Sequence, residues 1–144
     1  MRSRAGLRDC RGQSLVEFAL CTVLLVALIF AVLEFGRMML VYTTIANGAR
    51  IGARYAIVHG SDNSATTTQI KTAVNGYLKA GTINTAKATV SPNYPGKPDG
   101  TSSGCTDPGC LVTVKVTYQY DLLTHYFPLG SITFTSSSEG VITW

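Results

Sequence analysis

The feature that most constrains this sequence is an apolar run near its N-terminus. Residues 18–33 read FALCTVLLVALIFAVL and contain no charged side chain. Apolar residues extend the run on both sides, and a membrane-spanning helix needs about 20 such residues. The run is long enough if Glu34 and Arg37 lie at the far interface, where long side chains reach the headgroups. The sequence therefore predicts one membrane-spanning helix over about residues 15–41.

A cleavable secretory signal is the alternative interpretation, because it too begins with basic residues. Such a signal has a shorter apolar core and small residues after it, whereas this run ends in Leu-Glu-Phe-Gly-Arg at residues 33–37. Residues 1–12 contain four arginines and precede the run, while charge is sparser after it. The positive-inside rule therefore places the N-terminus in the cytoplasm.

Composition argues against a cytosolic protein and against a nucleic-acid-binding one. Only 14% of the 144 residues are charged, well below the ~25% of ordinary soluble domains. The formal net charge is +4, but residues 1–12 alone hold four arginines and one aspartate. The remainder of the chain is therefore nearly neutral, which excludes a broad basic face for nucleic acid.

The four cysteines, at positions 10, 21, 105 and 110, show no spacing typical of a zinc site. Cys105 and Cys110 bracket Thr-Asp-Pro-Gly, a turn-forming tetrapeptide. We interpret these two as a disulfide pair, with two free surface thiols as the alternative. Because such a bond persists in an oxidising compartment, residues 60–144 are expected outside the cytoplasm.

The first helix is expected to continue beyond the membrane, from about Ser14 to about Val58, because no proline occurs before Pro92. Its second half carries small residues at helical spacing, which leave room for the close approach of another backbone. These residues are Ala46, Gly48, Ala49, Gly52, Ala53 and Ala56. They pack either against this chain's own C-terminal part or against a neighbouring helix.

The C-terminal part combines a short helix with strands. Apolar residues recur at helical spacing over 70–78, and Gly81 follows as a stop signal. Strands are expected over 86–91, over 112–120, where valine and tyrosine alternate with polar residues, over 132–135, and as a last short piece over 141–144. Residues 92–110 are expected to form a long loop clipped by the cysteines. The predicted fold class is α+β: a long N-terminal helix and a small antiparallel sheet.

Nothing in the sequence indicates an active site, so we expect neither catalysis, nor a cofactor, nor a small-molecule substrate. His59 and His125 have no neighbours that would make a nucleophile and base pair. Scattered aspartates leave calcium binding between loops open, without any EF-hand spacing. Glu17 is the unusual residue, because an acidic side chain is costly in an apolar segment. It either caps its own helix, since Ser14-x-x-Glu17 is a capping box, or serves a function there.

Several motifs together resemble the TadE/TadG-like family of pilus assembly proteins. They are Arg11-Gly12-Gln13-Ser14-Leu15-Val16-Glu17-Phe18-Ala19-Leu20, then Glu34-Phe35-Gly36-Arg37, Asn47-Gly48-Ala49-Arg50 and Gly52-Ala53-Arg54. The resemblance is close over residues 11–58 and looser over the strand-rich end. It implies a TadE-like pseudopilin of the tight-adherence system, which assembles Flp pili related to type IV pili.

The resemblance also implies roles for individual residues. A prepilin peptidase cuts such proteins after a glycine, which here gives cleavage between Gly12 and Gln13. Glu17 then falls at the fifth mature position and Phe18 at the sixth. In pilin-like filaments the glutamate is thought to pair with the new N-terminus of a neighbouring subunit. Glycine before the cut also suits a peptidase that needs an extended backbone just before the helix.

The expected organisation is a basic leader, a long helix and an extracytoplasmic domain, over residues 1–12, 13–58 and 59–144. The expected function is that of a non-enzymatic minor pseudopilin. The expected location is the bacterial inner membrane, which the chain crosses once, and a pilus is a second location for such a subunit. Its partners are then membrane lipid, the prepilin peptidase, and other pilins with the Tad machinery. The alternative is an uncleaved bitopic protein with a membrane-anchored extracytoplasmic binding domain. The sequence does not separate a priming, structural or tip role.

Overall fold

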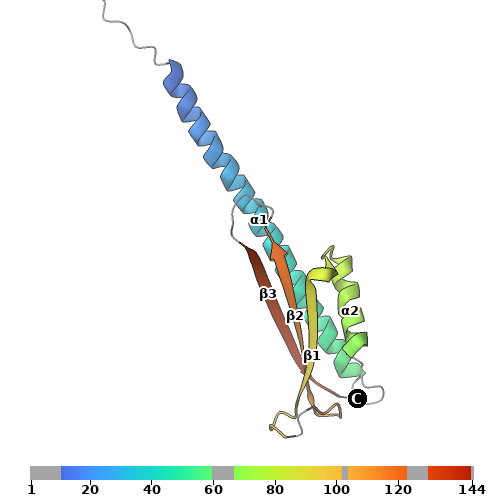
Figure 1. The fold of residues 1–144 in the computed structure, drawn as a ribbon. Helices are drawn as coiled ribbons and strands as arrows, with labels where there is room; N and C mark the ends of the chain where they lie inside the picture. The colour runs from blue at the N-terminus through green and yellow to red at the C-terminus, as the bar shows by residue number, and fades with distance from the viewer. Residues whose placement is uncertain (1–10, 60–66, 102–103, 123–129, 144) are drawn as a thin grey trace, which may run out of the picture. The chain divides into compact units, whose positions relative to one another are not determined.

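The structure, a computed structural model, describes residues 11–59, 67–101, 104–122 and 130–143. The chain divides into two compact units, residues 1–36 and 37–144, which are described separately here. The long helix α1, Arg11–Val58, belongs to both units. Unit 37–144 also contains the helix α2, a 3₁₀ turn and a three-stranded sheet (Figure 1). The predicted α+β fold, with a long apolar helix and an antiparallel sheet, is confirmed.

Helix α1 has 48 residues and ends at Val58, as expected, but it begins at Arg11 rather than at Ser14. Its composition explains its length, because residues 11–58 contain no proline and are rich in alanine, leucine and other residues that tolerate the helix interior. The earlier start places Ser14 inside the helix.

The sheet consists of β1, Ala88–Gly96, β2, Leu111–Asp121, and β3, Ser131–Val141, in the order β1-β2-β3. Both pairings are antiparallel. The central strand β2 is the one that the sequence shows most clearly. Its alternate residues Val112, Val114, Val116, Tyr118 and Tyr120 are buried, and the residues between them are half-buried or exposed. One face of the sheet is therefore core and the other faces solvent.

Strand β1 begins later and runs further than its sequence predicts. The 3₁₀ turn η1, Thr85–Lys87, precedes it, and the strand continues to Gly96 instead of ending at residue 91. The loop expected over 92–110 therefore starts only after Gly96. Residues 92–110 are rich in proline, glycine, serine and threonine, which favours a loop, yet Pro92 lies opposite Val114 in the register. An edge strand tolerates proline because one of its two sides forms no backbone hydrogen bonds with a neighbouring strand.

Strand β3 is also longer than expected. The piece predicted at 132–135 is part of one strand of 11 residues that pairs with β2 along its whole length. The last piece predicted over 141–144 is wrong for residues 142 and 143, because β3 ends at Val141; residue 144 lies outside the described residues. The inward positions of β3 end in Ser136, Ser138 and Gly140, which are half-buried. At Gly140 there is no room for a side chain, because a Cβ added there would clash with Ile57 Cδ1 of α1.

Helix α2, Thr67–Ala80, presents Ile70, Val74 and Leu78 to the core, as the helical spacing predicts. It ends in a Schellman motif, in which Ile83 N donates to Leu78 O and Thr82 N donates to Lys79 O. Thr82 holds the left-handed position with φ 59°, where glycine is usual. The helix ends near Gly81 as predicted, but the left-handed residue is Thr82, which follows Gly81.

The core of unit 37–144 lies between one face of the sheet and the two helices. Helix α1 contributes a stripe of mostly small residues, α2 contributes its three apolar residues, and β2 contributes its inward face. Figure 1 shows α2 and the second half of α1 alongside the sheet. The buried apolar residues are Ile45, Ala49, Ala53, Ala56, Ile70, Val74, Leu78, Ile83, Val90, Cys110, Val112, Val114, Val116, Tyr118, Tyr120 and Ile142.

Candidate functional site

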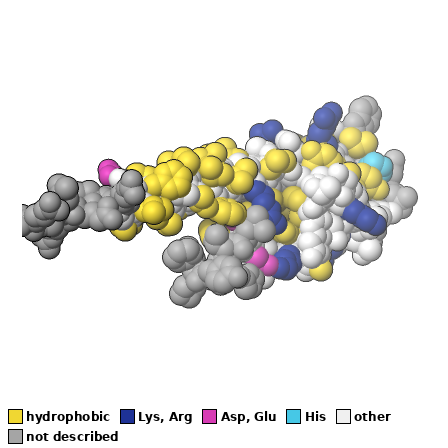
Figure 2. Space-filling model, turned by 90° about the horizontal axis from the view of Figure 1, so that it is seen from above, with side chains coloured by type: hydrophobic (Ala, Val, Ile, Leu, Met, Phe, Trp, Pro, Cys, Tyr) yellow, Lys and Arg dark blue, Asp and Glu magenta, His cyan; other side chains and the backbone are white. Residues whose placement is uncertain are grey.

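The first candidate site is the apolar surface of α1 in unit 1–36. The helix is long and apolar enough to cross a membrane, and none of its most apolar 18-residue window is buried. The exposed fractions of Leu15, Phe18 and Leu24 are 70%, 71% and 71%. Figure 2 shows a nearly continuous hydrophobic layer on this helix. Such a surface needs a bilayer or other apolar partners around it.

The bond between Gly12 and Gln13 lies in the first turn of α1, so its backbone is helical and not extended as we expected. A Cβ at Gly12 would meet nothing within 4 Å. The fold itself therefore gives no steric reason for glycine at this position.

Glu17 is exposed on α1, next to the exposed apolar side chains of Val16 and Phe18. The capping-box interpretation is wrong for this structure, because Ser14 lies inside the helix and does not precede it. Within the described residues, no ion pair or hydrogen bond of Glu17 is found. Glu17 and Gln13 are separated by four positions, so both lie on one face of α1.

The stripe of small residues in the second half of α1 packs inside the chain's own unit 37–144. Gly48, Ala49, Gly52, Ala53 and Ala56 are buried, and Ala46 is half-buried. A Cβ added at Gly52 would lie 2.7 Å from Val74 Cγ2 of α2 and 2.9 Å from Val114 Cγ1 of β2. Of the two alternatives left open by the sequence, the structure shows contact with the chain's own helix and sheet.

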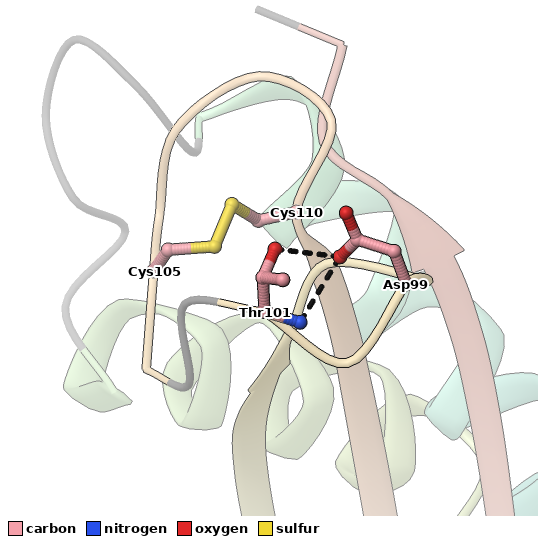
Figure 3. Close-up of a disulfide and its surroundings, with 4 residues drawn as sticks. All are labelled: Asp99, Thr101, Cys105 and Cys110. Atoms are coloured by element: carbon pink, nitrogen blue, oxygen red, sulfur yellow. Dashed lines mark hydrogen bonds between the residues drawn. A yellow bond between two sulfur atoms is a disulfide. The ribbon is translucent and has the colours of Figure 1, made fainter.

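The disulfide between Cys105 and Cys110 is present, with Cα atoms 6.0 Å apart (Figure 3). Cys110 is fully buried. Two backbone hydrogen bonds of 2.8 Å join this turn to the end of the chain, from Gly109 N to Ile142 O and from Ile142 N to Cys110 O. The disulfide thus closes the turn before β2, and the two hydrogen bonds hold that turn to Ile142, the residue after β3. Among the described residues, Cys21 is the free cysteine and is exposed.

The neighbouring loop contains one carboxyl group with a shifted pKa. Asp99 Oδ1 accepts hydrogen bonds from Thr101 Oγ1, at 2.6 Å, and from Thr101 N, at 3.0 Å (Figure 3). These bonds favour the ionised carboxylate and lower the pKa of Asp99, with the side-chain bond as the largest cause. Asp99 and Thr101 are two residues apart in the same loop, so these hydrogen bonds order the loop. They do not indicate a catalytic or ligand-binding site.

The remaining candidate residues do not assemble into a catalytic or metal site. His59 stacks on Tyr55 with ring centroids 4.2 Å apart, and its Nδ1 lies 3.0 Å from Tyr55 O. His125 lies outside the described residues. In the part of the chain that the structure describes, no group of three His, Cys, Asp or Glu side chains could hold a metal ion.

One polar cavity was not anticipated from the sequence. It has a volume of about 300 Å³ and lies within unit 37–144, between the start of that unit's portion of α1, the turn after α2, and the end of β2. The Arg37 guanidinium lies over the Tyr120 ring, 5.4 Å from its centroid, and Lys87 forms an ion pair with Asp121. Arg37, Lys87 and the adjacent pair Tyr120 and Asp121 lie in three separate parts of the sequence and belong to no motif, so only the fold brings them together.

Comparison with known proteins gives one match. Residues 12–54 match a family model described as TadE-like protein. The matched segment includes the Gly12–Gln13 bond, Glu17 and most of the stripe of small residues. No curated protein and no solved structure matches the chain.

Proposed function

Because residues 12–54 match the model of the TadE-like family, we propose that this chain is a minor pseudopilin of the tight-adherence pilus system. The family match and the long exposed apolar helix fit a membrane-anchored component of a Tad pilus. In this proposal residues 1–12 are a leader, residues 13–58 form the assembly helix, and residues 59–144 extend outside the cytoplasm. The protein acts by assembling with other pilus subunits and not by catalysis.

The family match over the N-terminal helix is the observation that carries this proposal. The disulfide supports the expected orientation, because a bond between Cys105 and Cys110 persists in the periplasm and is reduced in the cytoplasm. The basic residues before the helix support the same orientation, with the N-terminus in the cytoplasm. The chain is then single-pass in the inner membrane, with the peptidase and lipid as its first partners.

Processing is tested by N-terminal sequencing of the membrane-extracted protein. Co-expression with the cognate prepilin peptidase should remove residues 1–12 and leave Gln13 at the N-terminus. Gly12→Leu should block this step, and its fold should be unaffected because the position has open space around it. An uncut N-terminus in cells that carry the active peptidase would contradict the proposal and favour an uncleaved, bitopic binding protein.

Glu17 is proposed to pair with the α-ammonium that cleavage creates at Gln13 of a neighbouring subunit. In an apolar helix bundle, removing one charge of such a pair leaves the other unmatched, at a cost of about 3–5 kcal/mol. Glu17→Gln should therefore be inserted and cleaved normally but fail to join the assembly. Ser14→Ala is the matched control, because Ser14 lies in the helix without capping it.

The assay is restoration of pili and surface adhesion in a deletion strain, at matched protein level. Ser14→Ala should restore both, and Glu17→Gln neither. Normal piliation by Glu17→Gln would show that the charge is dispensable. The pairing of subunits through Glu17 would then be wrong, whether or not the leader is removed.

A further inference from the structure

The polar cavity in unit 37–144 has the dimensions and the lining of a small ligand site. Its volume of about 300 Å³ is at the lower end of the range for small-molecule pockets. Three parts of the fold line it: α1 with Arg37, Leu40 and Thr44, the turn after α2 with Thr82, and the C-terminal end of β2. The cavity is thus built from separate elements and is not a gap beside one loop.

The charged groups in the cavity favour an anion. Arg37 and Lys87 contribute two positive charges, and Asp121 contributes one negative charge through its ion pair with Lys87. The Asn84 side-chain oxygen already accepts a hydrogen bond from Ala86 N at 3.0 Å, which leaves its NH₂ group as a donor. An arginine fork, an ammonium and an amide are groups that bind a phosphate.

Other oxygens in the cavity can accept hydrogen bonds. The Thr44 hydroxyl donates to Leu40 O at 2.8 Å and the Thr82 hydroxyl donates to Gly81 O at 2.7 Å, so both hydroxyl oxygens keep lone pairs. Asp121 has carboxylate oxygens beside them. A ligand that carries hydroxyl groups next to a phosphate would satisfy both kinds of group at once.

The place of the cavity along the chain indicates where such a ligand comes from. Arg37 follows Leu33, the last residue of the uncharged run, by four positions in the sequence. Tyr120, which lines the cavity, begins a chain of aromatic contacts. Its ring centroid lies 5.7 Å from that of Phe134, and the Phe134 centroid lies 6.3 Å from that of the half-exposed Tyr42. Arginine and tyrosine at the end of an apolar span are typical of the headgroup level of a bilayer.

We propose that this cavity binds the headgroup of an anionic glycerophospholipid, with the phosphate at Arg37 and Lys87 and the headgroup hydroxyls toward Asp121. The inference rests on the proposed function to the extent that the apolar run must be in a membrane for the cavity to meet headgroups. Bound lipid would fix the height and rotation of unit 37–144 at the bilayer surface before the subunit leaves the membrane.

The test uses the full chain, purified in mild detergent and titrated with phosphatidylglycerol, phosphatidylcholine or inorganic phosphate alone. Native mass spectrometry counts the lipids retained. Wild type should retain one phosphatidylglycerol in preference to phosphatidylcholine, and inorganic phosphate should compete only weakly. Arg37→Gln should bind about tenfold more weakly, as expected for the loss of one charge-assisted hydrogen bond, while Arg37→Lys keeps part of the binding.

Arg54→Gln is the matched control, because it removes the same charge from the same helix and Arg54 lines a different hollow, with Tyr55 and His59. It should bind like wild type. Equal lipid retention by the wild type, Arg37→Gln and Arg54→Gln would overturn the proposal. If inorganic phosphate bound tightly and the chain did not distinguish the two lipids, the proposal that the ligand is a lipid headgroup would be overturned. Near-ultraviolet circular dichroism of each variant shows whether the tyrosines of the domain are packed as in the wild type.

Carbonate extraction of the same cells separates this inference from the proposed function. A chain released with the soluble proteins would contradict membrane anchoring, and with it the proposed function. A chain that stays in the membrane while Arg37→Gln retains lipid as wild type does would contradict the cavity assignment alone.

Discussion

Gly52 in α1 lies where two other elements press against the helix, and replacing it by alanine tests this packing. The added Cβ would come within 2.7 Å of Val74 and 2.9 Å of Val114. Both neighbours are β-branched and cannot turn away easily, because their χ1 rotamers are restricted. The helix, the second helix and the sheet meet at this point, so at least one of them must shift.

The magnitude follows from two opposing effects. Alanine in a helix interior gains about 1 kcal/mol over glycine, whereas overpacking a filled core costs about 1–3 kcal/mol. Gly76 in α2 supplies the matched control, because a Cβ there would meet nothing within 4 Å. Gly76→Ala should therefore stabilise the unit by about 0.5–1 kcal/mol. Gly52→Ala should be less stable than Gly76→Ala by about 1–3 kcal/mol.

Gly48 provides an intermediate case. Its added Cβ would lie 3.2 Å from Leu78 Cδ2, the far end of a flexible side chain that can move by a few tenths of an ångström. The expected order of unfolding free energies is Gly76→Ala highest, Gly48→Ala in the middle and Gly52→Ala lowest. A series in this order would reflect the distances and not the helical propensity of alanine, which is the same at all three positions.

The assay is denaturant unfolding of the full chain in detergent micelles, followed by near-ultraviolet circular dichroism. This signal reports the packing of the tyrosines of β2, so it follows unit 37–144 and not the micelle-bound helix. The slopes of the three transitions must agree for the comparison to hold. If Gly52→Ala proved as stable as Gly76→Ala, the close approach of α1 to Val74 and Val114 would be refuted.

Three further predictions concern the turns. Thr82→Gly should raise the unfolding free energy by about 1 kcal/mol, because a left-handed conformation costs an L-residue about 1–2 kcal/mol, and an unchanged midpoint would refute the strain at φ 59°. Changing Cys105 and Cys110 to alanine should remove about 2 kcal/mol by the chain-entropy model, and alkylation of both thiols without reductant would disprove the pairing. Thr101→Val should raise the pKa of Asp99 toward its ordinary value in an NMR titration, because the largest cause of the lowered pKa is lost. Since that pKa is depressed in the folded state, its contribution to stability is present above the ordinary aspartate pKa of about 4 and is lost as the pH falls through the folded value.

Much of the architecture could be predicted because the relevant signals are local. The apolar run identifies a helix able to span a membrane, since length and hydropathy are sufficient for that inference. The spacing of Ile70, Val74 and Leu78 predicts α2, and the alternation over 112–120 predicts β2, because each pattern directly reflects which face is buried. The cysteine pair was predicted from the turn between its members, and the structure contains that disulfide.

The candidate site was predictable only in part. Gly12, Gln13 and Glu17 form a linear motif, and the family match covers them, but the capping box of Ser14 and Glu17 was wrong. The capping box required a helix start at Ser14, whereas α1 starts at Arg11. Helix ends depend on flanking residues that compete for the same backbone groups, so a capping pattern at one position does not exclude an earlier start.

The sequence by itself determined the elements whose burial pattern is written in adjacent residues: the apolar helix, α2, β2 and the disulfide turn. Tertiary structure decided the rest. The inward face of β3 carries glycine at position 140 because Ile57 of α1 leaves no room for a Cβ there, and no local apolar pattern announces this approach. Pro92 remains in β1 because that strand lies at the sheet edge. Arg37, Lys87 and Asp121 line one cavity only because helix, turn and strand meet there. Contacts between distant residues depend on how elements pack, and a single sequence carries no local signal for them.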